Sequence, residues 1–300
     1  MNAHSSVSDT TMLSGVSETL LITLAARAVG TAKLPRSMGR DVTAERLCRE
    51  LGVDLTRYGA SPSTIKGVLA RGTWFDSRCL WALDRYDNPL FVSLGSGLNT
   101  MYERIASRAG SRRFLWVDSD LPDVVALRRR LLPDDERRRT LELDLTSDNW
   151  LDAIGWTAAR PIIFVAEGVL MYFPEPVVAG LFRSIAQQFS SRAPVQALFD
   201  WASPTMVRRS RSHPAVGRTK DKSVMFRWAL RRARDIARFD RRWHIAAEHD
   251  LMLQSGAAPA LFSLAYRLAT GHRFYGCAQA TLMSPTPEKL IAAVNERMQA

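Results

Sequence analysis

The spacing of hydrophobic residues changes near residue 86. Before that point, apolar residues recur at helical spacing over residues 16–29, 43–51 and 62–81. This pattern predicts helices and makes residues 1–85 a helical amino-terminal cap. After it, short apolar runs with strand character alternate with helical segments. The chain is therefore expected to place a helical cap before a core of residues 86–300.

Strands and helices alternate regularly through this core. Apolar runs that end near residues 94, 118, 145, 167 and 200 are predicted strands, with helices near 99–109, 122–132, 150–154 and 174–189 between and after them. Residues 243–248 and 273–283 are the last predicted strands, separated by a helix near 251–268. The alternation predicts an α/β fold whose seven-stranded, mainly parallel sheet carries helices on both faces.

Residues 203–242 interrupt the alternation. Residues 206–214 are basic and have little apolar periodicity, so 203–242 is expected to be a lid insertion after the fifth strand. Within it, residues 224–239 are predicted to form a helix on which Arg227, Arg231, Arg234 and Arg238 share one stripe.

Candidate chemistry gathers at the ends of the predicted strands. The first strand ends in a turn with Gly95 and Gly97, and the next three end at Asp118, at Asp144 and at Glu167. Glycines after the first strand let a ligand approach the backbone, and an acid about 20 residues later can accept from ribose hydroxyls. Because the carboxyl ends of parallel strands form one edge, these residues predict a site for a nucleoside-bearing cofactor.

The glycine turn helps to choose the cofactor. A dinucleotide site has a third glycine where the helix packs on the strand, and here Thr100 stands at that position. S-adenosylmethionine has a ribose, an adenine, an ammonium, a carboxylate and a sulfonium but no phosphate, so it suits the acids Asp118 and Asp144 better than NAD does. An NAD-dependent oxidoreductase stays open as an alternative.

Five segments then resemble a known family. Residues 68–76, 94–100, 117–118, 143–146 and 166–173 are similar to the leucine carboxyl methyltransferase family, and in particular to its bacterial polyketide O-methyltransferases of the tetracenomycin type. The segment from Glu167 to Tyr172, Glu-Gly-Val-Leu-Met-Tyr, is the most specific part. The resemblance covers nearly the whole chain and implies a Rossmann-like class I methyltransferase fold with S-adenosylmethionine as cofactor and S-adenosylhomocysteine as product.

The resemblance also implies roles for individual residues. Arg71 would pair with the methionine carboxylate of the cofactor, and Gly95 and Gly97 would let the backbone pass its amino-acid part. Asp118 would hold the ribose, while Asp144 and Leu145 would contact the adenine.

Glu167 would bind the amino end of the cofactor or form the rim of the substrate pocket. Glu167 and Tyr172 are also the catalytic candidates, although neither is an obvious base. The family usually has an Asp and an Arg after the glycine turn, where this chain has Asn99 and Met101, so a polar contact there is missing or rebuilt.

The composition bears on where the protein is located and on whether it binds a metal. The longest apolar runs are short or interrupted by charges, and residues 1–13 lack the order of a signal peptide, so a cytoplasmic protein without membrane association is expected. Cys48, Cys79 and Cys277 are far apart and without zinc-like spacing, and the five histidines, His213 among them, are scattered. No metal site is expected.

The net charge of +11 fits an anionic partner, and it fits equally a chain with many arginines on solvated helix faces. Arginines of residues 208–211 and of the predicted stripe could attract a small acidic metabolite or a peptide carboxyl end. A basic nucleic-acid-binding protein is a second alternative, but the interleaved aromatic residues that it would need are missing. The leading hypothesis is O-methylation of a carboxylate or a phenol, and the absence of an obvious base favours a carboxylate, which is already ionised.

Overall fold

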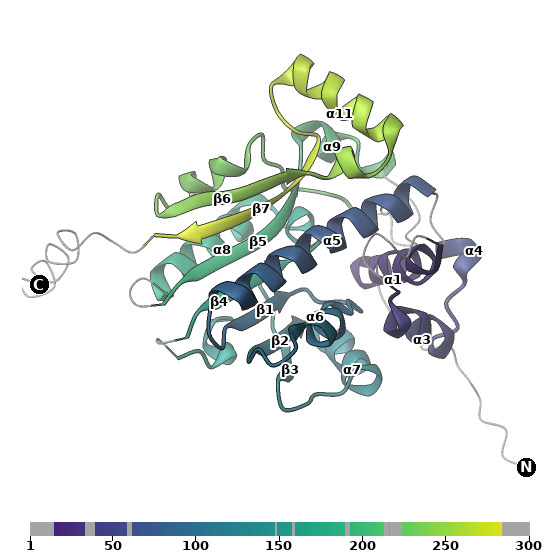
Figure 1. Ribbon diagram of the computed structural model, residues 1–300. Coiled ribbons are helices and arrows are strands. Elements are labelled where there is room, and N and C mark those ends of the chain that lie inside the picture. The colour runs from purple at the N-terminus through teal and green to yellow at the C-terminus, as the bar shows by residue number, and fades with distance from the viewer. Residues whose placement is uncertain are drawn as a thin grey trace, which may run out of the picture.

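A seven-stranded sheet runs through the centre of the computed structural model (Figure 1). The structure describes residues 15–33, 40–58, 62–147, 149–157, 160–189, 193–212, 216 and 224–283. The strand order is β3-β2-β1-β4-β5-β7-β6; β1 to β5 pair in parallel, and β7 runs antiparallel to both neighbours. The strands are β1 (Leu90–Leu94), β2 (Leu115–Asp120), β3 (Arg138–Glu142), β4 (Ile162–Ala166), β5 (Val195–Ala202), β6 (Trp243–Asp250) and β7 (Tyr275–Leu282). The predicted α/β fold with a mainly parallel sheet of seven strands is confirmed.

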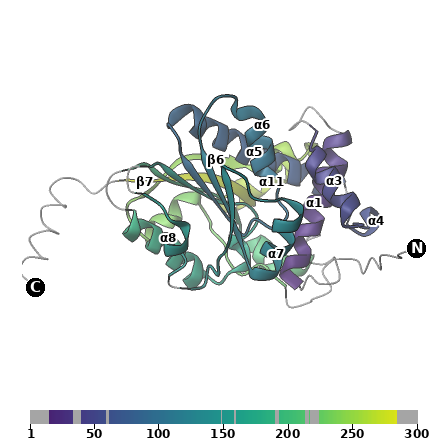
Figure 2. The same cartoon turned by 90° about the horizontal axis from the view of Figure 1, so that it is seen from below.

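Helices cover both faces of this sheet (Figure 2). Helices α5 and α6 pack on the face that carries Phe91, Trp116 and Ile163, whereas α8 packs on the face that carries Val92 and Phe164. The α-helices are α1 (Gly15–Lys33), α3 (Val42–Glu50), α4 (Leu55–Tyr58), α5 (Pro62–Arg85), α6 (Met101–Ala109), α7 (Pro122–Leu131), α8 (Glu175–Gln188), α9 (Pro204–Arg208) and α11 (Ala257–Thr270). Short 3-10 helices are η2 (Asp152–Ile154), η3 (Leu170–Tyr172), η4 (Ser210–Ser212), η5 (Ala233–Arg238) and η6 (Leu251–Gln254).

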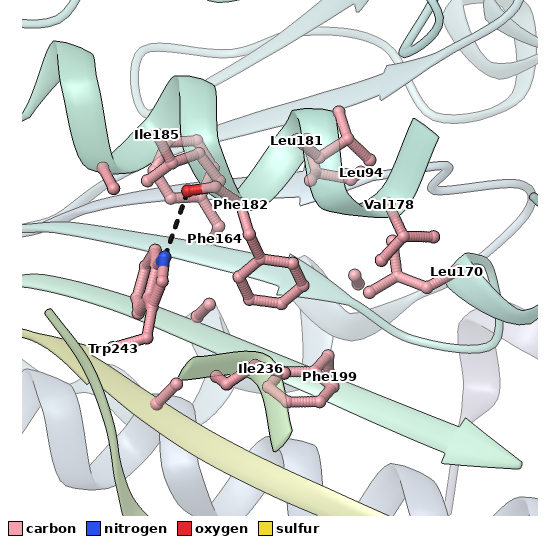
Figure 3. Close-up of a cluster of buried hydrophobic side chains, with 14 of the residues drawn as sticks. Leu94, Phe164, Leu170, Val178, Leu181, Phe182, Ile185, Phe199, Ile236 and Trp243 are labelled. Atoms are coloured by element: carbon pink, nitrogen blue, oxygen red, sulfur yellow. Dashed lines mark hydrogen bonds between the residues drawn. The ribbon is translucent and has the colours of Figure 1, made fainter. Parts of the chain in front are cut away.

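Aromatic side chains fill the core between α8 and the sheet (Figure 3). Phe182 of α8 lies edge-on to Phe199 of β5 and to Trp243 of β6. The indole Nε1 of Trp243 donates to the carbonyl of Phe182 at 3.0 Å, which satisfies its polar atom inside the core. This packing holds α8 against β5 and β6.

Helices α1, α3 and α4, which precede β1, share a separate apolar cluster with α7. Leu21 and Leu24 of α1 pack with Leu47 of α3 and with Leu127 and Leu131 of α7. Helix α5 continues from this cluster across the sheet, and in Figure 1 it crosses in front of the strands. The helical segments expected before the first strand are therefore present, and α1 and α5 reach the carboxyl ends of the strands.

The predicted helix at residues 224–239 is wrong. Residues 224–230 are extended and η5 covers only Ala233–Arg238, so the four arginines do not share a helical stripe. Phe226, Trp228 and Leu230 are buried while Arg227 between them is exposed, an alternation that suits an extended chain. The amide of Arg227 donates to the carbonyl of Met171, and that of Leu230 to Ala202, so the segment bonds to the core.

The observed ends of some strands and helices differ slightly from the predicted ones. Strand β2 continues to Asp120, and β3 ends at Glu142, before Asp144. Where a loop was expected after β5, α9 and η4 form, while residues 213–215 and 217–223, with His213, lie outside the described residues. In the described part of the chain, no helix has the length and apolar character to cross a membrane.

We predict that Gly276→Ala destabilises the protein. Gly276 pairs with Trp201 across β7 and β5, and a Cβ at residue 276 would lie 2.5 Å from the buried indole ring of Trp201. Overpacking of this kind costs about 1–3 kcal/mol, which urea unfolding would detect as a lower midpoint. Gly180→Ala is the matched control, since a Cβ there meets nothing within 4 Å and α8 gains an alanine. Equal midpoints for Gly276→Ala and the wild type would contradict this packing.

Candidate cofactor site

A cavity of about 360 Å³ opens at the carboxyl ends of the central strands. Its walls come from α1, α5, the turn after β1, the end of β2, the segment after β4, α9, η6 and the start of β7. This is the edge where ligands bind in doubly wound α/β folds. The predicted site residues in its lining are Arg71, Gly95, Gly97, Glu167 and Tyr172.

The glycine turn after β1 forms one wall. Gly95 and Gly97 have φ angles of 61° and 51°, in the left-handed region that favours glycine. A Cβ on Gly95 would lie 2.5 Å from Cγ2 of Val169, so the turn also fits tightly against the segment after β4. Glycine is therefore required at Gly95 for both conformation and space.

Arg71 and Glu167 meet at the base of the cavity. Arg71 comes from α5 and Glu167 follows β4, and Nε of Arg71 donates to Oε1 of Glu167 at 3.1 Å. The other oxygen of Glu167 accepts from Nδ2 of Asn99 at 2.8 Å, and Arg27 of α1 lies 4.0 Å from Oε1. The side chain of Glu167 is only 3% exposed, so its charge depends on these partners.

The surrounding charges keep Glu167 ionised. Burial alone would raise the pKa of Glu167, but the positive charges of Arg71, Arg27 and Arg104 and the amide of Asn99 lower it below its ordinary value. Burial likewise opposes the charge of Arg71, yet its negative neighbours raise its pKa. The cavity thus contains a stable pair of opposite charges beside the glycine turn.

Asp200 and Tyr275 complete the surroundings of Arg71. Nη1 of Arg71 donates to Oη of Tyr275 at 2.8 Å and to Oδ2 of Asp200 at 3.3 Å, and the Tyr275 hydroxyl also donates to Oδ2 of Asp200. Neither residue was expected at the site from the sequence. Asp200 could have been noticed as an acid at the end of an apolar strand, as Glu167 was, but the pairing of β7 with β5 that brings Tyr275 to it is a tertiary contact.

The ribose prediction for Asp118 does not fit the structure. Asp118 is 2% exposed and lies outside the cavity lining; its Oδ1 accepts from the indole of Trp116, and its Oδ2 accepts from Nη2 of Arg128 at 2.5 Å. Asp120 lines the cavity instead. Its oxygens accept from the amides of Gly97 at 2.7 Å and Leu121 at 2.8 Å, and burial raises its pKa despite these bonds. The difference arises because β2 ends two residues later than predicted.

Asp144 and Leu145 also lie outside the cavity lining. Asp144 is exposed and accepts from the amide and the hydroxyl of Thr146, and these bonds lower its pKa. Leu145 is buried in the core cluster under α8. The structure does not bring these two residues to the cavity, and their role at the adenine stays a prediction.

Tyr172 faces the cavity from η3 and packs edge-on to Phe226. Burial raises the pKa of Tyr172, although a hydrogen bond with Thr19 and the charge of Arg71 oppose this shift. The phenol is therefore protonated at neutral pH, and the catalytic role of Tyr172 stays a prediction.

A second ion cluster contacts Thr100, which follows the glycine turn. Arg104 of α6 donates to both oxygens of Asp76 at 2.8 and 2.9 Å and to Asp41 at 3.2 Å. Asp41 caps α3 and also accepts from the hydroxyl of Thr100 at 2.6 Å, directly after the turn. Arg104 is therefore a buried cation on α6. This helix begins at Met101, where the family usually has an arginine.

Solved structures resemble the fold over most of the chain. A methyltransferase from Thermobifida fusca superposes with a TM-score of 0.54 at 15% identity, covering 86% of this chain and 94% of that one. A protein from Streptomyces avermitilis superposes with a TM-score of 0.52 at 15% identity, covering 84% and 95%. At 15% identity these likenesses show the α/β fold, in which ligands bind at the carboxyl edge of the sheet.

Comparison with related sequences identifies the family of the chain. The tetracenomycin polyketide synthesis O-methyltransferase of Streptomyces glaucescens is 28% identical over 78% of this chain and 85% of its own length. An S-adenosylmethionine-dependent methyltransferase of Gibberella zeae is 29% identical, covering 59% of this chain and 62% of that protein. The leucine carboxyl methyltransferase profile matches residues 20–186, more than half of the chain, so the chain belongs to this family. It is an S-adenosylmethionine-dependent methyltransferase, and the oxidoreductase alternative is set aside.

We predict that Arg104→Gln strongly destabilises the protein. The substitution leaves the buried carboxylates of Asp76 and Asp41 without their main cation, and removing one partner of a buried ion pair costs about 3–5 kcal/mol. Urea unfolding followed by circular dichroism measures the loss.

Arg113→Gln is the control for this loss, because Arg113 and its partner Asp87 are 70% and 80% exposed and exposed pairs contribute little. A similar small effect for both variants would show that the Arg104 cluster does not stabilise the fold.

Proposed function

We propose that the protein transfers the methyl group of S-adenosylmethionine to a carboxylate or phenol oxygen of a small, acidic secondary metabolite or of a peptide carboxyl end. The observation that carries the proposal is the buried pair of Arg71 and Glu167 beside the glycine turn. A positive and a negative group held together in a cavity complement the carboxylate and the ammonium of an amino-acid moiety. The name of the Streptomyces glaucescens relative supports oxygen as the acceptor.

Each part of the cofactor has a proposed partner in the cavity. Nη2 of Arg71 has no hydrogen-bond partner among the described residues, so it is the donor left for the carboxylate. Oδ1 of Asn99 is buried without a partner in that same part of the chain, and together with Glu167 it suits the ammonium. Gly95 and Gly97 line the cavity and are the proposed backbone neighbours of the amino-acid chain.

For the ribose we propose Asp120 in place of Asp118. Asp120 lies at the end of β2, lines the cavity and is tied to the glycine turn through the amide of Gly97. Each of its oxygens accepts one backbone hydrogen bond and retains lone pairs for ribose hydroxyls. Leu121 and Val124 lie next to it in the lining and are the proposed apolar neighbours of the adenine.

One part of the cavity is apolar and suits a hydrophobic acceptor. Its side chains come from η3, α9, the segment before η5 and the residue before β7: Met171, Tyr172, Met206, Phe226 and Phe274. Methionine and aromatic side chains adapt to flat, apolar molecules. An anionic group on the acceptor fits the net charge of +11, which raises the local concentration of anions around the protein.

Methyl transfer from a sulfonium needs alignment and exclusion of water more than acid–base chemistry. An oxygen of the acceptor attacks the methyl carbon, the carbon–sulfur bond breaks, and its electron pair stays on sulfur to give S-adenosylhomocysteine. None of the described histidines lines the cavity, and Tyr172 is protonated. A carboxylate acceptor, which arrives ionised, therefore suits this site best.

We predict that Asp120→Ala weakens S-adenosylhomocysteine binding, measured by isothermal titration calorimetry. Losing hydrogen bonds to a charged group costs about 1–3 kcal/mol, or about 5- to 150-fold in Kd. Asp123→Ala is the control, since Asp123 is exposed at the start of α7 outside the cavity. An unchanged Kd for Asp120→Ala would refute the ribose role.

The nature of the acceptor can be tested by pH. Release of S-adenosylhomocysteine is measured with aromatic carboxylic acids and with their phenol counterparts. Because a carboxylate has a pKa of about 4 and a phenol of about 10, turnover of a carboxylic acid should stay flat between about pH 6 and 8, whereas turnover of a phenol should rise. Methylation of neither class, or of amines alone, would contradict O-methylation.

A further inference from the structure

Arg71 is held by two groups besides Glu167, namely Asp200 and Tyr275. Asp200 is 0% exposed in β5, outside the cavity lining, and accepts from three donors: the amide of Gly168 at 2.7 Å, the hydroxyl of Tyr275, and Nη1 of Arg71 at 3.3 Å. Tyr275 does line the cavity, and its hydroxyl accepts from Nη1 of Arg71 at 2.8 Å. Both groups therefore hold the same nitrogen of Arg71.

The sheet fixes this arrangement. β5 and β7 pair antiparallel with Ala202 opposite Tyr275 and Asp200 opposite Cys277, so Asp200 and Tyr275 are diagonal neighbours on one face. Side chains at such positions are within reach of each other when one is aromatic. The contact is thus set by strand register and not by a loop.

The backbone at Gly168 also lies close to the guanidinium group. Gly168 has φ of 70°, and a Cβ there would lie 2.9 Å from both Nη1 and Nη2 of Arg71. With Nε held by Glu167 and Nη1 held by Tyr275 and Asp200, only the direction of Nη2 is left for a ligand.

We propose that Asp200 and Tyr275 are positioning residues that orient Arg71 toward the carboxylate of the cofactor. The inference rests on the proposed role of Arg71 and deepens it, since it assigns the preorganisation of that contact to two residues on β5 and β7. Holding an arginine side chain in place before binding removes part of the entropy cost of ordering it in the complex. The effect is specific to the amino-acid end of the cofactor, because the adenosine end lies at Asp120 in the proposed arrangement.

The test compares two ligands on the full chain. S-adenosylhomocysteine has the amino-acid part, whereas 5′-methylthioadenosine has the adenosine and thioether but no carboxylate or ammonium. Tyr275→Phe should weaken S-adenosylhomocysteine about tenfold, as expected for one hydrogen bond. The Kd of 5′-methylthioadenosine should stay within about twofold of the wild type, since this ligand does not use Arg71. Asp200→Asn should give the same selectivity.

A double-mutant cycle separates positioning from a local structural effect. In an Arg71→Leu background, Tyr275→Phe should have no further effect on S-adenosylhomocysteine, because the group that it orients is gone. Tyr266→Phe is the matched control, since the Tyr266 hydroxyl bonds to Thr205 outside the cavity, and its affinity for both ligands should equal that of the wild type.

The outcomes are distinct. Selective weakening of S-adenosylhomocysteine, lost in the Arg71→Leu background, supports the inference. Equal weakening of both ligands, no weakening, or additive effects with Arg71→Leu overturn it. Absence of S-adenosylhomocysteine binding by the wild type would instead overturn the proposed cofactor arrangement and the inference with it. If Asp200→Asn fails to fold, Tyr275→Phe decides, because it removes one hydroxyl and leaves the buried carboxylate intact.

Discussion

The structure around the cavity depends on one buried interaction, the contact of Arg71 with acids from separate strands. Glu167 follows β4, Asp200 lies in β5, and both are almost completely removed from water. Neither carboxylate could be buried without a cation, and Arg71 could not be buried without them. The ion cluster therefore ties α5, which precedes the sheet in sequence, to two strands in its centre.

Two consequences follow for the site. Burial opposes the charges while opposite charges restore them, so the pKa of Glu167 is lowered and that of Arg71 is raised, and both stay ionised. The pKa of Asp200, by contrast, is raised, chiefly by burial and against the pull of Arg71. The two acids thus differ. Glu167 lines the cavity and has a lowered pKa, whereas Asp200 lies outside the cavity lining and has a raised pKa. This difference agrees with the proposed division between a binding group and a positioning group.

The sequence predicted the sheet and the glycine turn well because these are local patterns. Apolar runs of strand length and glycines at Gly95 and Gly97 appear directly in the chain. It failed at residues 224–239, where arginines at helical spacing suggested a helix but burial of Phe226, Trp228 and Leu230 against the core selects an extended chain. Asp120 was missed for a related reason: it points to the same side of β2 as Asp118, and only the end of the strand decides which acid reaches the edge.

By itself, the sequence determined the order of elements, the glycine turn, and the placement of Glu167 after a buried strand, since these follow from neighbouring residues. The tertiary structure decided which side chains share the cavity. Asp200 and Tyr275 meet only through the pairing of β5 with β7, and Arg71 reaches them only because α5 packs across the sheet. Such contacts join residues more than 70 positions apart, and no local pattern of the chain specifies them.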